Sequence, residues 1–254
     1  MGKLLGHQIR NHFRSNWFIP VLPVALILFG VLFSNVNNEI GGSAVGIGMV
    51  ALMFGYFAAS ISVIVGDYNM FFGDSALFYE STPISPSAKT FSRFLYYLIM
   101  LIIYSLYVAL ICFLFMAAPS VDGGVQHITW ADISKVINEV GVRNILIGVA
   151  WVLITLFNNI ISIIFAVTLG GGKKLRRFGL GGPVLVYIVL GLVEVLIIFI
   201  LDKFDLFTSM ELFLNNGDVF MRGMGIGILI PTLIETIALF VAVYYMHKKR
   251  ISVS

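Results

Sequence analysis

Four polar residues that could bind or carry a charge lie deep within apolar runs. They are Asn158, Asn159, Glu194 and Glu235. Glu194 follows Pro183 by eleven residues, and Glu235 precedes Met246 by eleven. At 1.5 Å per helical residue, both carboxyl groups would lie about 16 Å from the same side of a bilayer. Polar groups at that depth cost several kcal/mol unless they are paired or hydrated, so we expect a polar layer inside a helix bundle.

The two glutamates have three interpretations, and the residues alone leave them open. Glu194 and Glu235 could line a path or contact a cationic substrate, together with Asn158 and Asn159. They could instead be hydrogen-bonded to Asn, Ser or backbone groups and hold helices together. As a third interpretation, they could carry protons in an ion-coupled carrier.

Patterns for catalysis or metal binding are missing from the sequence. There is no Ser-His-Asp, Cys-His or zinc-protease arrangement, and His7, His12, His127 and His247 have no ligand spacing. The only cysteine, Cys112, lies in an apolar run and cannot form an internal disulfide. We therefore expect that this chain carries no catalytic residue, no metal and no cofactor.

The composition is that of a membrane protein. Of 254 residues, 59% are hydrophobic and 11% are charged, and the mean hydropathy is +0.99. Ordinary globular chains are about 25% charged. The net charge of +3 is explained better by membrane topology than by a nucleic-acid partner.

Six apolar runs approach the ~20 residues that a ~30 Å hydrocarbon core requires. They cover residues 17–33, 44–65, 94–117, 145–169, 183–201 and 223–246. We therefore predict an all-α fold with six transmembrane helices in a single transmembrane domain over residues 1–254. Before them, Leu5, Ile9 and Phe13 are spaced four apart, which predicts an amphipathic interfacial helix over 1–16.

The basic residues give the orientation. If the N-terminus is cytoplasmic, the inner segments carry twelve of the sixteen Lys and Arg residues and the outer segments carry four. This is the positive-inside pattern of a plasma-membrane protein. It predicts that both termini and the segments 67–93 and 170–182 are cytoplasmic.

A polar segment separates the second and third apolar runs. Its sequence over residues 79–93 is YESTPISPSAKTFSR, with Pro83, Pro86 and the potential helix caps Ser85 and Ser87. We predict a short helix over 85–92 that lies flat on the cytoplasmic membrane surface. The preceding acidic and aromatic residues, from Asp67 to Asp74, suit a surface on which a partner docks.

The order of a long apolar run, acidic and aromatic residues, a Pro- and Ser-containing turn, Lys89, Arg93 and another apolar run resembles the coupling region of type 2 ATP-binding-cassette exporter permeases. In that family a short cytoplasmic helix fits a groove on the ATPase subunit. The resemblance implies that eight residues contact the ATPase: Tyr79, Glu80, Pro83, Ser85, Pro86, Ala88, Lys89 and Arg93.

The resemblance also implies the rest of the assembly. Two copies of a separate ATPase subunit would bind ATP and Mg, and a second permease, identical or similar, would complete the path. The cargo would be an amphipathic, antimicrobial or toxin peptide, as in systems resembling phenol-soluble modulin exporters of bacteria. Segment 202–222 would contain short re-entrant helices on the outer side, with an ordinary outer loop as the alternative.

This chain has no nucleotide-binding motif of its own. The loop GGGKKLRRFGLGG over 170–182 lacks the G-x-x-x-x-G-K-[ST] pattern, because Lys174 stands where Ser or Thr is needed. We interpret the loop as a topology signal or a contact for anionic lipid.

Two other function classes stay open. One is a proton-coupled secondary transporter that uses Glu194 and Glu235, although the two halves of the chain show no evident repeat of broken helices. The other is a membrane anchor or sensor subunit that does not transport.

Overall fold

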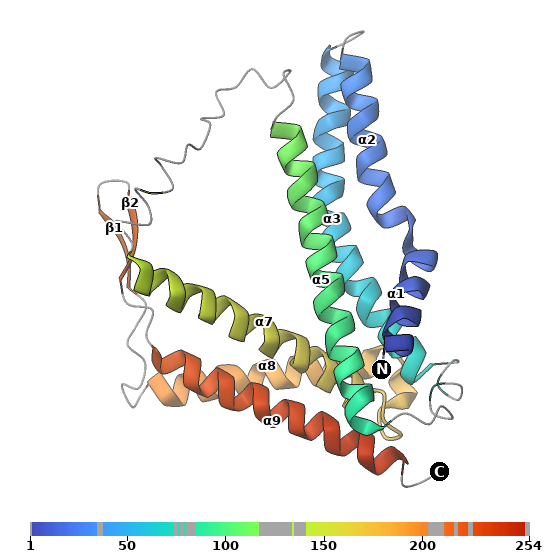
Figure 1. Cartoon of the computed structure of the whole chain (residues 1–254), viewed down its shortest axis with the longest axis vertical. Coiled ribbons are helices and arrows are strands. Elements are labelled where there is room, and N and C mark those ends of the chain that lie inside the picture. Colours follow the sequence, from blue (N-terminus) through green and yellow to red (C-terminus); the bar gives the residue numbers. More distant parts are fainter. Residues whose placement is uncertain are drawn as a thin grey trace. The chain divides into compact units, whose positions relative to one another are not determined.

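The protein is described by a computed structural model (Figure 1). It describes residues 2–34, 38–73, 76, 79, 85–116, 134, 141–202, 211–215, 218–222 and 226–251. The contacts divide the chain into two compact units, Met1–Val125 and Gln126–Ser254. Each unit is described by itself below.

The first unit is helical, and the second adds a short hairpin. The first contains α1 (Gly2–Asn16), α2 (Phe18–Ser34), α3 (Asn38–Phe71) and α5 (Pro86–Met116). The second contains α7 (Val142–Gly170), the 3-10 turn η1 (Arg176–Phe178), α8 (Gly181–Asp202), β1 (Glu211–Asn215), β2 (Asp218–Arg222) and α9 (Ile226–Ile251).

The helices identify a multi-pass membrane protein. Within the described residues, α3, α5, α7, α8 and α9 are each long and apolar enough to cross a bilayer. A sixth crossing requires α1 and α2 together, which meet at a bend of 47°. The predicted crossing by residues 17–33 alone is therefore not established, because α2 has only 17 residues.

The N-terminal helix forms as predicted, and a polar face of it is buried. Leu4, Gln8 and His12, spaced four apart, are its buried residues. The apolar stripe of Leu5, Ile9 and Phe13 is only partly covered. A partly exposed apolar stripe suits a helix that lies at a membrane surface.

Close packing of α2 against α3 depends on glycine (Figure 1). A Cβ at Gly30 would lie 2.6 Å from Val45 Cγ2, and one at Gly48 would lie 2.6 Å from Ile27 Cγ1. By contrast, Gly42 and Gly46 form a G-x-x-x-G motif on α3, and a Cβ at either position would have no neighbour within 4 Å.

Helix α5 begins where the sequence predicted a helix start. Pro86 occupies the first position, and the Ser85 hydroxyl accepts a hydrogen bond from the Ala88 N–H at 3.3 Å. The helix then continues without interruption to Met116. A separate short helix over 85–92 is thus not observed, because neither Pro nor Gly interrupts the sequence after Pro86.

The segment before α9 differs from the predicted re-entrant helices. Strands β1 and β2 pair antiparallel, with Glu211 opposite Arg222 and Asn215 opposite Asp218. Residues 211–215 and 218–222 therefore pair as two strands instead of forming short helices. Residues 203–210 lie outside the described residues.

The basic loop after α7 is closed by contact between two glycine backbones. A Cβ on Gly182 would lie 2.5 Å from the Gly170 oxygen, and a Cβ on Gly170 would lie 2.5 Å from the Gly182 carbonyl carbon. Gly179 has φ +54°, a conformation that favours glycine. The loop leaves Lys173, Lys174 and Arg177 exposed.

Replacing Gly170 with alanine should destabilise the folded chain by about 1–3 kcal/mol, because the added methyl group meets backbone atoms that cannot rotate away. Gly191→Ala on α8 is the matched control, since a Cβ there has no neighbour within 4 Å. Thermal unfolding of both purified variants in one detergent measures the difference. Equal stability of the two variants would contradict this packing.

Candidate functional site

A polar cluster joins helices α7, α8 and α9 in the second unit. The Asn158 amide nitrogen lies 3.5 Å from Glu235 Oε2, and the Thr236 hydroxyl donates to Asn158 Oδ1 at 3.2 Å. Glu194 approaches the same place from α8, where its carboxyl group lies near that of Glu235. We call Asn158, Glu194, Glu235 and Thr236 the polar layer.

The chemistry of the polar layer follows from its two carboxyl groups. Two carboxyl groups can share a hydrogen bond only if one of them carries the proton. Glu194 and Glu235 are both partly buried, so they retain some access to their surroundings. The pair could hold and release a proton, or could bind a cationic or hydrogen-bonding group in place of that proton.

The sequence predicted three of the four polar-layer residues, namely Asn158, Glu194 and Glu235. It also predicted Asn159, which is not part of the polar layer. Asn159 is exposed, and its amide donates to the Thr155 carbonyl of its own helix at 2.9 Å. Adjacent helical residues point about 100° apart, so Asn158 and Asn159 cannot both face one neighbour. Thr236 was missed, and its position next to Glu235 was the only available signal.

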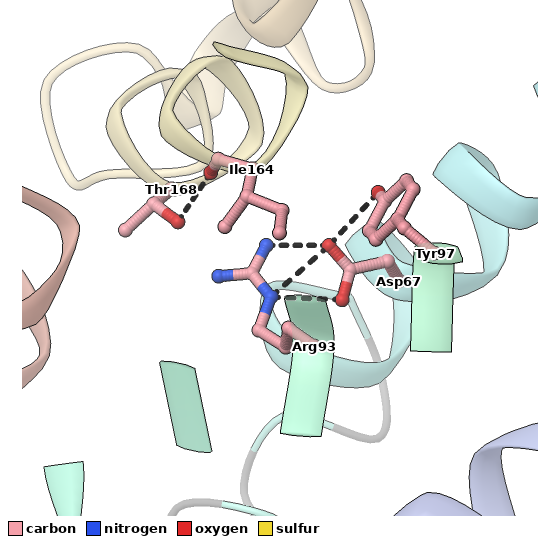
Figure 2. A network of polar contacts seen from close by, with 5 residues as sticks. All are labelled: Asp67, Arg93, Tyr97, Ile164 and Thr168. Atoms are coloured by element: carbon pink, nitrogen blue, oxygen red, sulfur yellow. Dashed lines mark hydrogen bonds and ion pairs between the residues drawn. The ribbon is translucent and has the colours of Figure 1, made fainter. Parts of the chain in front are cut away.

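A second polar cluster braces α3 against α5 in the first unit (Figure 2). The Arg93 Nε donates to Asp67 Oδ1 at 2.9 Å, and Arg93 Nη2 pairs with Asp67 Oδ2. The Tyr97 hydroxyl donates to Asp67 Oδ2 at 3.1 Å. Both charged side chains are 0% exposed. We call Asp67, Arg93 and Tyr97 the α3–α5 brace.

Aromatic rings complete the surroundings of this brace. The Arg93 guanidinium lies 5.0 Å from the Phe71 ring centroid and 5.8 Å from that of Phe72. Tyr68, Phe71 and Phe72 are buried. In the stretch that the sequence suggested as a docking surface, Phe71 and Phe72 therefore pack inside the protein and stabilise the buried cation. Asn69 of the same stretch is exposed, and Asp74 lies outside the described residues.

The residues predicted to contact an ATPase differ in their exposure. Lys89 and Arg93 are buried, and Tyr79 packs between the rings of His7 and Phe71 at centroid distances of 6.0 and 5.7 Å. Ser85 is exposed, and Pro86 and Ala88 are partly exposed. Glu80 and Pro83 lie outside the described residues.

One exposed face remains at the start of α5. It consists of Ser87 and Phe91, which are one helical turn apart, with Phe91 48% exposed. The predictions did not include Phe91. Its position four residues after Ser87, between buried Thr90 and Ser92, was the available signal.

A third group of hydrogen bonds fastens α1 to α5. His12 Nε2 lies 2.9 Å from the Tyr104 hydroxyl, and its Nδ1 lies 3.1 Å from the Tyr96 hydroxyl. The Ser92 hydroxyl donates to Gln8 Oε1 at 3.0 Å. Spacing within the sequence gives no signal for these contacts, because they join residues more than 80 positions apart.

The described residues contain no group of three His, Cys, Asp or Glu side chains that could hold a metal ion. Comparison with protein-family models, with curated proteins and with solved structures finds no match.

Proposed function

We propose that this chain is the membrane-spanning permease subunit of an ATP-driven exporter of the ATP-binding-cassette type, working with a separate ATPase subunit. The observation that carries the proposal is the α3–α5 brace beside an exposed face at the start of α5. The resemblance of residues 67–93 to the coupling region of that family supports the same proposal.

The α3–α5 brace supports a coupling role because it joins two long helices. Helix α3 has 34 residues and α5 has 31, so they extend about 51 and 46 Å, well beyond a ~30 Å hydrocarbon core. The Asp67–Arg93 ion pair links the end of α3 to the start of α5. A force applied at Ser87 and Phe91 would therefore move both helices as one element.

The positive-inside pattern supports an orientation in the cell membrane with both termini cytoplasmic. In that orientation the exposed Lys173, Lys174 and Arg177 lie on the cytoplasmic side. The same side would hold the start of α5 and two ATPase subunits with their ATP and Mg.

The polar layer supports a path for cargo. Asn158, Glu194 and Glu235 offer hydrogen-bonding groups in helices that are otherwise apolar. A second copy of this chain, or a similar permease, would enclose the path. The proposed cargo is an amphipathic peptide, whose basic and amide groups the carboxyl pair could contact.

A second candidate function is a proton-coupled carrier. The feature that favours it is the proximity of the Glu194 and Glu235 carboxyl groups, because two neighbouring carboxyl groups could share a proton. Such a carrier would need no ATPase, and its transport would stop when the proton gradient is removed.

To test the proposal, the tagged full chain should be purified from its native membrane with its bound partners. We expect an ATP-hydrolysing subunit to co-purify, and Phe91→Ala to reduce its recovery about tenfold because the exposed aromatic anchor is lost. Phe113→Ala is the matched control, since Phe113 is also exposed on α5 but lies about 33 Å farther along. Equal recovery with both variants would refute docking at this face. Gradient-driven transport by the isolated chain in vesicles would favour the carrier.

A further inference from the structure

A polar pocket lies between α1 and α3 in the first unit, apart from the polar layer. Its volume is about 240 Å³. Helix α1 contributes one wall and the last turns of α3 contribute the other, with Tyr79 and Tyr96 completing the lining. Its described lining includes neither the exposed face of Ser87 and Phe91 nor any residue of the α3–α5 brace.

The lining is rich in groups that both donate and accept hydrogen bonds. Amides and hydroxyls come from Asn11, Ser15, Asn16, Ser62 and Asn69. Among the described residues, no Lys, Arg, Asp or Glu lines the pocket. This part of the lining offers no cation to a phosphate and no carboxylate to an ammonium group.

The two ionisable groups outside the spans are also uncharged near neutral pH. Burial lowers the pKa of His12, on α1, to about 4. Burial raises the pKa of the Tyr79 hydroxyl. The pocket therefore presents a neutral hydrogen-bonding surface.

One buried donor in the lining has no acceptor. Gln8 is 0% exposed, and its Oε1 accepts from Ser92, but its Nε2 has no partner among the described residues. A buried unpaired amide N–H costs about 1–3 kcal/mol. A bound hydroxyl group that reached it after a small side-chain movement would remove that cost.

Exposed aromatic and aliphatic side chains adjoin the pocket. Trp17 and Phe18 are exposed directly after the α1 wall, as is typical of residues at a membrane interface. On α3, Phe57 and Ile61 are exposed within the five residues before Ser62. A lipid with its headgroup in the pocket could lay its acyl chains along these apolar side chains.

We propose that this pocket binds an uncharged, hydroxyl-rich group such as a hexose. Hydroxyl groups donate and accept, so they match amide and hydroxyl walls without requiring charge. The volume equals that of about eight water molecules in the liquid, which suits a single sugar ring but not a peptide helix. The source is either the headgroup of a neutral glycolipid or a free sugar.

The test adds a monoglucosyl diacylglycerol to the full chain in detergent and counts bound lipid by native mass spectrometry. The comparison ligands are diacylglycerol with the same acyl chains, phosphatidylglycerol and free glucose. We expect the glucosyl lipid to bind at one saturable site, at least about tenfold more tightly than the other two lipids. Binding of glucose itself at the same site supports recognition of an uncharged, hydroxyl-rich group. It also identifies a free sugar, and not a lipid headgroup, as the ligand.

The variants separate this pocket from the rest of the surface. Gly66→Leu should abolish binding by filling the pocket, because a Cβ there meets only Tyr96 Oη at 3.6 Å and the longer side chain has room to enter. Gly46→Leu, on the same helix with open space around it, should bind normally. Asn11→Ala with Asn69→Ala should weaken binding roughly tenfold by removing two wall amides.

Three results would overturn the proposal. The first is that neither sugar ligand binds saturably to the unmodified chain, which would indicate that the pocket holds only water. The second is binding that Gly66→Leu leaves unchanged. The third is equal binding of phosphatidylglycerol with the same dependence on the variants. None of these results depends on whether an ATPase is the partner.

Discussion

Replacing Arg93 with methionine should lower the free energy of unfolding by about 3–5 kcal/mol, the largest effect on stability that we expect. Arg93 and Asp67 are both 0% exposed and paired. Removing one member leaves a buried charge without its partner, which costs far more than the net gain from forming the pair. Thermal or denaturant unfolding of the purified chain in detergent measures the loss.

The control removes both charges. Asp67→Leu combined with Arg93→Met should recover most of the lost stability, because no unpaired charge remains and two apolar side chains fill the site. Tyr97→Phe should cost less, about 1.5–3 kcal/mol, since it removes one hydrogen bond from a charged carboxylate that keeps Arg93. If the double variant is as unstable as Arg93→Met alone, the ion pair is not the reason for the loss.

In the proposed exporter, the double variant also separates stability from coupling. The chain should fold, yet ATP hydrolysis should drive less export, because α3 and α5 are no longer held together by the ion pair. Full export per folded complex would show that the brace is structural only.

Glu235→Gln should reduce transport per folded complex by about tenfold or more, the largest functional effect that we expect. Glu235 contacts both Asn158 and Glu194. A hydrogen bond that involves a charged group contributes about 1.5–3 kcal/mol, and a tenfold change in rate corresponds to 1.36 kcal/mol. Transport into inverted vesicles, normalised to folded complex, measures the effect.

The neighbouring asparagines supply the matched control for this experiment. Asn158→Ala removes a member of the polar layer, whereas Asn159→Ala removes an exposed amide that bonds only to its own helix in the hydrogen bonds described. We expect Asn158→Ala to lower transport and Asn159→Ala to leave it unchanged. Equal transport by both variants would remove the polar layer from the path.

The same variants distinguish the three interpretations of the glutamates. If Glu194 and Glu235 are structural, the Gln variants lower thermal stability and transport falls only with the amount of folded protein. If they line an ATP-driven path, transport per folded complex falls while the ATPase stays bound. If they carry protons, transport persists without ATPase and ends when the gradient is removed.

The sequence by itself determined the helical, membrane-embedded nature of the chain and many helix positions. The length of an apolar run decides whether a helix can cross a bilayer, and that is a local property. The start of α5 at Pro86 with the Ser85 cap was equally local, because a cap acts over three residues. The amphipathic helix over 1–16 followed from its spacing of four.

The tertiary structure decided which of the marked residues act together. Arg93 was predicted to face a partner, but a carboxylate 26 residues earlier in the chain engages it inside the protein. Asn158 and Asn159 looked equivalent until α9 supplied a neighbour for only one of them. Gly30 and Gly48 make the close contact between α2 and α3, whereas Gly42 and Gly46 face open space. In each case the partner lies far away in sequence, and spacing within one helix does not encode which face that partner covers.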